Sequence, residues 1–204
     1  RYALNKGLDV YGIERGYVGL INNHINQMNR RSVSDIIQRG GTILKTARCD
    51  EFKELEYMSQ SVDNMEAYGI DGLVVIGGDG SFRGAKDLYD NFGTQVIGIP
   101  GTIDNDLAYT DYTLGFDTTV NTVLNAINNL RDTMTSHDRV CIIEVMGRKC
   151  GDIALYAGLG GGAELILVPE VPFDLATVVK SIKLNQRIGK TSDIIVLAEG
   201  VCKA

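Results

Sequence analysis

The stretch Leu73-Val-Val-Ile-Gly-Gly-Asp-Gly-Ser81 joins four apolar residues, three of them β-branched, to a glycine-rich turn. A short run that is apolar on both faces is typical of a strand buried in a parallel sheet. Apolar residues at helical spacing follow at once, from Phe82 to Phe92. The sequence therefore predicts that residues 77–81 form the turn between a strand and a helix.

Such a turn has the chemistry of a phosphate site. Backbone N–H groups and the positive end of a helix dipole attract phosphate, and glycines let the backbone approach the phosphate oxygens closely. Asp79 adds a hard oxygen ligand of the kind that Mg²⁺ prefers. The plain alternative is a glycine turn with a helix-capping aspartate, and short glycine motifs alone do not separate the two.

The bulk composition excludes several classes of protein. The chain has 204 residues, long enough for one large domain or two small ones, and its 44% hydrophobic and 23% charged residues are ordinary for a globular protein. A net charge of −6 argues against nucleic acid or an anionic membrane as a partner. No apolar run is long enough to span a bilayer. The cysteines form no C-x-x-C pair, so we expect reduced thiols in a cytoplasmic protein. They are Cys49, Cys141, Cys150 and Cys202.

Strands and helices alternate along the chain. The expected strands are 8–13, 73–76, 95–100, 140–145, 165–168 and 194–198, and the expected helices are 55–68, 82–92, 117–135, 152–158 and 175–188. Elsewhere we expect a glycine-punctuated loop at 14–20, polar surface at 22–29, a short helical segment at 33–39, and a strand or extended loop at 42–48. Residues 1–7 are typical of the last turns of a helix stopped by Gly7.

This order predicts an α/β fold with two doubly wound, mostly parallel domains of Rossmann-like three-layer type. We place the domains at 1–115 and 116–204. In such sheets ligands bind outside the carboxyl ends of the strands. Polar side chains that directly follow apolar runs should therefore gather at one edge. They are Asp79, Thr102, Asp104, Asp106, Arg148 and Glu199.

Three strings together resemble the bacterial type of the ATP-dependent 6-phosphofructokinase family: Gly77-Gly-Asp-Gly-Ser81, Pro100-Gly-Thr-Ile-Asp-Asn-Asp106 and Met146-Gly-Arg148. The likeness extends over essentially the whole chain. The second string is very specific, whereas the first is shared with lipid kinases and NAD kinases. The family's N-terminal phosphate loop and its C-terminal part would lie outside these residues, so we expect a fragment.

The resemblance implies that MgATP phosphorylates the 1-hydroxyl of fructose 6-phosphate, the committed step of glycolysis. Asp104 matches the general base, and Thr102 would lie beside the transferring phosphoryl group. Arg148 would supply a cation, and Asp79 would bind Mg²⁺. Phosphoryl transfer depends mainly on positioning and charge neutralisation, for which this set is sufficient.

The resemblance also implies three groups of binding residues. For ATP they are Tyr17, Arg48, Cys49, Gly78, Asp79, Gly80, Ser81 and Gly84. For the sugar phosphate they are Thr102, Ile103, Asp104, Met146, Gly147, Arg148 and Glu199, with Arg139 reaching into a neighbouring subunit of a homotetramer. For the effectors ADP and phosphoenolpyruvate they are Arg30, Arg31, Ser32, Val33, Ser34, Asp35, Arg131, Gly162, Ala163, Glu164 and Lys190. One position departs from the pattern, because Ile188 stands where a second Lys is usual.

Two glycines bear on the phosphoryl donor. In the pyrophosphate-dependent relatives of this family the position of Gly80 carries Asp and that of Gly101 carries Lys. Bare glycines leave room for the longer nucleotide, so we expect ATP. The alternatives are a pyrophosphate-dependent enzyme and a non-catalytic, ligand-sensing subunit of the same fold. Both glycines could also serve backbone geometry at positive φ.

Overall fold

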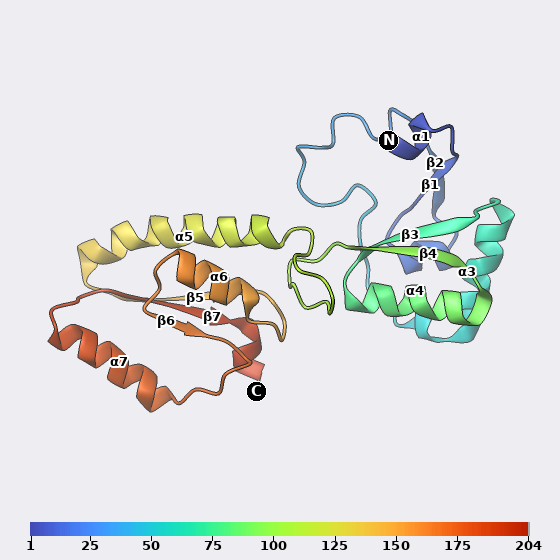
Figure 1. Cartoon of the computed structure of the whole chain (residues 1–204). Helices are drawn as coiled ribbons and strands as arrows, with labels where there is room; N and C mark the ends of the chain where they lie inside the picture. The colour runs from blue at the N-terminus through green and yellow to red at the C-terminus, as the bar shows by residue number, and fades with distance from the viewer. Residues whose placement is uncertain (204) are drawn as a thin grey trace. The chain divides into compact units, whose positions relative to one another are not determined.

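Two units make up the chain in the computed structural model, which describes residues 1–203. The first unit comprises residues 1–75 and 80–98, and the second comprises residues 76–79 and the chain from Ile99 onward. Figure 1 shows the elements of each unit. The division into domains at residue 115 stays a prediction.

The first unit begins with short elements and continues into a helical pair. Its elements are α1 (Tyr2–Asn5), β1 (Val10–Ile13), α2 (Tyr17–Ile21), β2 (Ile25–Met28), a 3₁₀ turn at Glu51–Lys53, α3 (Leu55–Ala67) and α4 (Asp79–Phe92). Strands β1 and β2 pair antiparallel, from Val10 opposite Met28 to Ile13 opposite Ile25. The side chains of Phe52, Met58 and Leu88 form the centre of a buried cluster in this unit.

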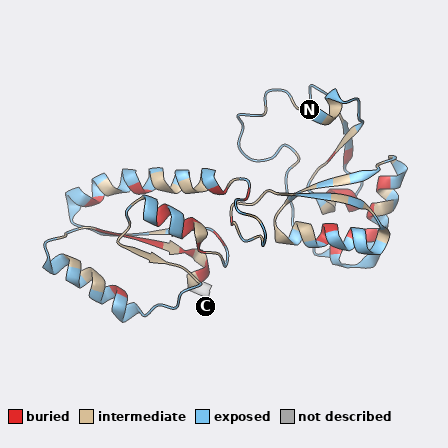
Figure 2. Cartoon of the chain, in the orientation of Figure 1, coloured by how far each residue is buried: buried red, intermediate tan, exposed pale blue. Residues whose placement is uncertain are grey.

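Strands β3 (Gly72–Gly77) and β4 (Gln95–Pro100) pair in a two-stranded sheet, and α4 connects them. The prediction that 73–76 is buried on both faces is wrong. Leu73 and Val75 are half-buried, whereas Val74 and Ile76 are 57% and 65% exposed. Figure 2 colours the chain by burial and shows both strands of this sheet without the colour of buried residues. The described part of the chain packs against one face of this sheet, so burial alternates along the strand.

The second unit is a parallel α/β sheet. Its elements are α5 (Phe116–His137), β5 (Val140–Val145), α6 (Asp152–Gly160), β6 (Leu165–Leu167), α7 (Leu175–Arg187), β7 (Asp193–Ala198) and a 3₁₀ turn at Glu199–Lys203. The strand order is β5-β7-β6, with both pairings parallel. Helices α5 and α6 cover one face and α7 covers the other (Figure 1). The predicted α/β class with mostly parallel strands is confirmed.

The core of this unit lies between α5, α6 and the central strand β7. Phe116, Ile127, Ile153 and Val196 are each 0% exposed. Because the three strands run in the same direction, the loops that follow Val145, Leu167 and Ala198 share one side of the sheet, here called the carboxyl edge. The segments that precede β5, β6 and β7 form the opposite, amino edge.

Two local expectations in the first unit are wrong and a third is incomplete. The loop expected at 14–20 becomes helix α2 from Tyr17, because Leu20 and Ile21 are buried. The polar stretch at 22–29 lies mostly at the surface, as expected, but it also contains strand β2, whose backbone pairs with β1. Residues 33–39 form turns and no helix, and Ile37 is 97% exposed. A helix of one or two turns without a packed apolar face is not stable.

Other expectations agree with the structure. Helix α1 ends before Gly7, which has a φ of +78°, and residues 42–48 form turns and extended loop. Helix α4 begins at Asp79, three residues before the expected start at Phe82, and the other strand and helix bounds differ from the prediction by two residues or fewer. Cys49, Cys141 and Cys150 are free thiols, and the Cys202 side chain lies outside the described residues. No helix in the described part of the chain is long and apolar enough to cross a membrane.

Candidate active site

The glycine-rich stretch forms the expected strand–turn–helix. Strand β3 ends at Gly77 and α4 begins at Asp79, which places Asp79 in the first turn of the helix. Gly101 N donates to Gly77 O at 3.0 Å. A Cβ at Gly78 would lie 3.5 Å from the Cβ of Thr102. The phosphate-type turn and the loop that follows β4 therefore lie against each other.

Asp104 is the buried acid of this loop, with only 7% of its surface exposed. The Nε of Arg148 lies 3.2 Å from its Oδ2, and its own backbone N–H donates to Thr102 Oγ1 at 3.3 Å. Arg148 follows β5, so the pair joins residues that follow two different strands. The structure thus brings together the predicted base, hydroxyl and cation.

The backbone of Arg148 is held as firmly as its side chain. Its φ is +54°, a conformation that a residue with a Cβ adopts only where the surroundings require it. Its N–H donates to Glu199 Oε1 at 2.8 Å, and Glu199 directly follows β7. A Cβ at Gly200 would lie 2.2 Å from Arg148 O, so only glycine allows this approach. The loops after β5 and β7 are therefore packed together at the carboxyl edge.

The surroundings of Asp104 change its pKa in opposite directions. Burial raises the pKa of its carboxyl group, Arg148 lowers it, and the charges of Asp106 and Glu199 raise it further. The net result is a raised pKa. A carboxyl group with a raised pKa holds a proton more readily than an exposed one, which suits a general base.

Sequence reasoning missed a second layer of polar residues around this pair. Asn105 Oδ1 accepts from Thr113 N at 3.0 Å, and Asn105 Nδ2 donates to Asp152 Oδ2 at 2.8 Å. Glu170, after β6, accepts from Gly151 N at 2.7 Å, at the start of α6. Asn105 lies within the most specific string of the sequence. An asparagine between two aspartates at a strand end was the available signal.

The predicted nucleotide residues of the first unit come together around Tyr17. Its hydroxyl donates to Ser81 O at 2.5 Å, and its ring stacks on Phe52 with centroids 3.9 Å apart. A Cβ at Gly84 would lie 2.9 Å from the Tyr17 ring. Burial raises the pKa of the Tyr17 hydroxyl. Tyr17 thus supports the backbone of the turn, and Phe52 was missed by sequence reasoning.

The other two nucleotide candidates differ in burial. Cys49 is half-buried and packs against the cluster that contains Phe52, and burial raises the pKa of its thiol. Arg48 is exposed.

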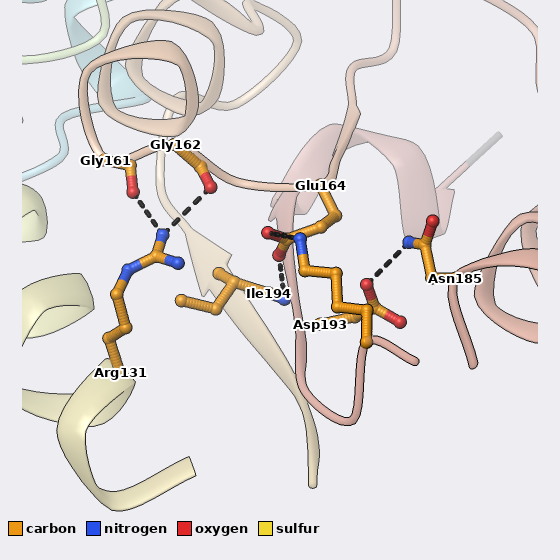
Figure 3. Close-up of polar contacts among 8 residues, drawn as sticks. Arg131, Gly161, Gly162, Glu164, Asn185, Asp193 and Ile194 are labelled. Carbon is orange, nitrogen blue, oxygen red and sulfur yellow. Dashed lines mark hydrogen bonds and ion pairs between the residues drawn. The ribbon is translucent and has the colours of Figure 1, made fainter. Parts of the chain in front are cut away.

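The predicted effector residues of the second unit lie at its amino edge (Figure 3). Arg131 donates to the carbonyl oxygens of Gly161 and Gly162 at 2.5 and 2.9 Å. Glu164 forms an ion pair with Lys190 and accepts from Ile194 N at 2.5 Å. Burial acts to raise the pKa of Glu164, but its bonds from Lys190 and Ile194 outweigh this and lower it.

The remaining predicted residues lie apart from these groups. Arg30 to Asp35 form an exposed turn of the first unit, where Ser34 Oγ donates to Arg30 O. Arg139 precedes β5, whereas Arg148 follows it, and the six residues of that strand span about 20 Å. The structure therefore does not bring Arg139 to Asp104 within one chain. Met146 is 61% exposed, Gly147 is buried at a φ of +138°, and Ile103 and Ala163 pack against the core.

The donor set fits one kind of metal site. Among the described residues, no three His, Cys, Asp or Glu side chains gather as a metal cage. Mg²⁺ is commonly held by one or two carboxylates together with substrate phosphates rather than by an all-protein cage. Asp79, in the first helical turn beside Gly78, offers such a carboxylate. The residues therefore fit Mg²⁺ that arrives with a nucleotide.

Fold and site together define an α/β protein that combines a glycine-rich helix start with a buried carboxylate and an arginine. The model of the family described as "Phosphofructokinase" matches residues 1–204. The chain belongs to this family, and the resemblance stated from the sequence is confirmed at that level.

Curated relatives give the same result. The chain is 61% identical over 201 residues to "ATP-dependent 6-phosphofructokinase 1" of Clostridium perfringens, covering 98% of this chain and 63% of that protein. It is 62% identical over 204 residues to "ATP-dependent 6-phosphofructokinase" of Clostridium tetani, covering 100% of this chain and 64% of that protein. The chain thus spans less than two thirds of the length of these relatives.

Solved structures share the fold. The phosphofructokinase of Pichia pastoris in the T-state superposes with a TM-score of 0.87 at 34% identity, covering 98% of this chain and 25% of that one. The pyrophosphate-dependent phosphofructokinase of Marinobacter aquaeolei superposes with a TM-score of 0.83 at 24% identity, covering 94% of this chain and 52% of that one. At that identity the second likeness concerns the fold alone.

Proposed function

We propose that the protein containing this chain transfers the γ-phosphoryl group of MgATP to the 1-hydroxyl of fructose 6-phosphate, giving fructose 1,6-bisphosphate and ADP. The observation that carries the proposal is the buried Asp104 carboxylate, 3.2 Å from the Arg148 guanidinium and in a loop whose Thr102 lies against Gly78 of the glycine-rich turn. The names of the Clostridium relatives support the donor and the acceptor. The reaction is the committed step of glycolysis.

Each residue has its own role in the proposed reaction. Asp104 accepts the proton of the sugar hydroxyl as that oxygen attacks the γ-phosphorus. Arg148 and the hydroxyl of Thr102 stabilise the charge that spreads over the transferring group. Mg²⁺, when bound at Asp79, neutralises phosphate charge. Glu199 accepts hydrogen bonds from the sugar, with Met146, Gly147 and Ile103 beside it.

Gly80 supports ATP rather than pyrophosphate as the donor. A Cβ at Gly80 would meet no atom within 4 Å, so the space beside the helix start is open to a long nucleotide. A Cβ at Gly101 would lie 2.7 Å from Ile76 Cγ2, which gives this glycine a packing role. The idea that both glycines serve a positive φ is wrong, because neither lies in that region.

Regulation and assembly belong to the same proposal. We place ATP and Mg²⁺ in residues 1–115, the sugar phosphate in 116–204, and ADP or phosphoenolpyruvate among Arg30–Asp35, Arg131, Gly162–Glu164 and Lys190. The functional unit would be a cytoplasmic homotetramer in which Arg139 contributes to a neighbouring site. The separation of Arg139 from Arg148 by the length of β5 supports a role in another subunit.

A donor comparison tests the proposal. The full-length protein is assayed for fructose 1,6-bisphosphate with MgATP and with magnesium pyrophosphate, beside its Gly80→Asp and Asp104→Ser variants. We expect turnover with ATP alone. Gly80→Asp should nearly abolish it, and Asp104→Ser should lower kcat about 10²–10⁴-fold. Equal use of pyrophosphate by the parent would overturn the choice of donor, and normal turnover of Asp104→Ser would remove Asp104 from the base role.

A further inference from the structure

We infer that Asn105 is a positioning residue that fixes the catalytic loop by bridging it to the start of α6. The inference rests on the proposed role of Asp104 as the base, because Asn105 is its neighbour in the chain. Asn105 itself does not need to touch a substrate. It acts through the backbone that carries Asp104.

The side chain of Asn105 uses its acceptor and its donor at once. Its Oδ1 accepts from the backbone N–H of Thr113 at 3.0 Å, and the hydroxyl of Thr113 lies 3.4 Å from the same atom. Its Nδ2 donates to Asp152 Oδ2 at 2.8 Å. Thr113 is only 4% exposed, so the first of these bonds lies in a largely dry environment. The Asn105 amide therefore joins two segments of the loop, at residues 105 and 113, to each other and to the first turn of α6.

The backbone of Asn105 is compatible with few other residues. Its φ is +55°, in the left-handed region where asparagine and aspartate are tolerated better than other residues with a Cβ. Aspartate would keep the acceptor for Thr113 but lose the donor for Asp152, and glycine would lose both. This position therefore requires a residue that tolerates a left-handed backbone conformation and whose side chain has both a hydrogen-bond donor and an acceptor.

Besides the side chain of Asn105, three contacts hold the loop near Asp104: Asp104 N donates to Thr102 Oγ1, Cys150 Sγ lies 4.0 Å from Asn105 O, and Ile103 packs against the core. Residues 101–115 form no helix or strand, and backbone bonds at the base of the loop join Gly101 N to Gly77 O and Leu114 N to Pro100 O. Asp104 lies between these anchors and faces Arg148. A displacement of about 1 Å in a reacting group costs about 10²-fold in rate, so a fixed loop matters more for turnover than for substrate binding.

The test exchanges the donor and the acceptor of the hydrogen bond between Asn105 and Asp152. Asn105→Asp places two carboxylates face to face, so we expect kcat to fall about 10²-fold. The KM values for ATP and the sugar should change little. Asp152→Asn alone keeps an oxygen opposite the Asn105 amide, and kcat should stay near that of the parent. In the double variant the introduced amide donates to the introduced carboxylate, and kcat should return to within about tenfold of the parent.

A matched pair elsewhere in the unit serves as the control. Asn185 Nδ2 donates to Asp193 Oδ1 at 2.7 Å, at the amino edge of the sheet (Figure 3). Asn185→Asp creates the same clash away from the reacting groups. It should lower the free energy of unfolding without changing kcat per folded molecule. All kcat values are taken on the plateau of the pH profile, so a change in the pKa of Asp104 does not enter.

The outcomes separate the inference from the proposed function. Unchanged kcat in Asn105→Asp, a folded double variant without recovery, or an equal loss in Asn185→Asp would each overturn the inference. If Asn105→Asp does not fold, Asn105→Gly removes both bonds without added charge and carries the same expectation. Asp104→Asn is assayed beside them. Normal turnover in that variant would overturn the role of Asp104 itself, whichever way the Asn105 variants behave.

Discussion

Two opposing effects have the largest influence on the pKa of the Asp104 carboxyl group. Burial raises its pKa, and the Arg148 guanidinium lowers it. Without the cation, the pKa of this buried carboxyl group would be higher, and a larger share of it would be protonated and unable to accept the hydroxyl proton. In the proposed reaction Arg148 therefore has two roles, because it faces the transferring phosphoryl group and also lowers the pKa of the base.

Removing Arg148 should shift the pH dependence of the reaction in a known direction. The proposed reaction requires ionised Asp104, so we expect activity to be lost as pH falls through the pKa of that group. Arg148→Gln removes the lowering influence, the pKa rises, and the acid limb of kcat/KM moves to higher pH in addition to the fall in rate. A pH–rate profile of the full-length enzyme measures this.

Lys149→Gln provides the control, because it removes an exposed cation from the same loop and has no ion pair with Asp104 within the described residues. Its acid limb should lie close to that of the parent. An acid limb that stays in place in Arg148→Gln would show that the guanidinium does not set the pKa of Asp104.

At the scale of elements, α4 owes its place to a glycine on its buried side. Gly84 lies against the Tyr17 ring, and Tyr17 in turn donates to Ser81 O in the first turns of the same helix. Stacking of Tyr17 on Phe52 fixes the ring on its other side. The helix, the ring and the turn therefore form one packed group.

Two glycine substitutions in α4 should have opposite effects on stability. In Gly84→Ala the new methyl group would lie 2.9 Å from Tyr17 and 3.2 Å from Phe52, so we expect a loss of about 1–3 kcal/mol in the free energy of unfolding. Gly80→Ala adds a methyl group to the same helix in open space, and should gain up to about 1 kcal/mol. Urea unfolding measures both. A Gly84→Ala protein as stable as Gly80→Ala would contradict the packing described for Tyr17.

The elements with strong sequence patterns were predictable, and those fixed by distant contacts were not. Helix α5 and strands β4 and β5 follow from long periodic or purely apolar runs. Helix α2 and strand β2 depend on burial against α3 and on pairing with β1, which no local pattern reveals. Asp104 and Arg148 were likewise predictable as site residues, because each comes shortly after the end of a predicted strand. The bond from Asn105 to Asp152 joins residues 47 positions apart, and spacing along the chain does not predict such a contact.

Across the second unit as a whole, the two edges of the parallel sheet carry different chemistry. Asp104, Arg148 and Glu199 gather at the carboxyl edge, whereas Glu164, Lys190 and the arginine before β5 belong to the amino edge. The central strand β7 runs between them, with Asp193 at one end and Glu199 just past the other. We therefore expect Arg139 to contribute to a site in a neighbouring subunit rather than to the site in its own chain.

Mixed tetramers should reveal such sharing by Arg139. Subunits with Arg139→Ser and subunits with Asp104→Ser are each expected to be inactive, but a mixed pair contains one intact site. Random pairing across an isologous interface should restore about one quarter of the sites. Mixing Arg148→Ser with Asp104→Ser subunits is the control, because both residues lie in one site of one chain and no recovery is expected. Mixed tetramers verified by native mass spectrometry that stay inactive would place Arg139 within its own chain.

The open face of the β3–β4 sheet governs how these residues behave in concentrated solution. Val74, Ile76 and Ile97, each more than half exposed, form an apolar row on strands whose edges can pair with strands of other molecules. The net charge of −6 opposes such association, and salt screens that repulsion. We therefore expect a sample of residues 1–204 alone to be colloidally most stable when it is dilute and at low ionic strength, and to self-associate through this row as either is raised.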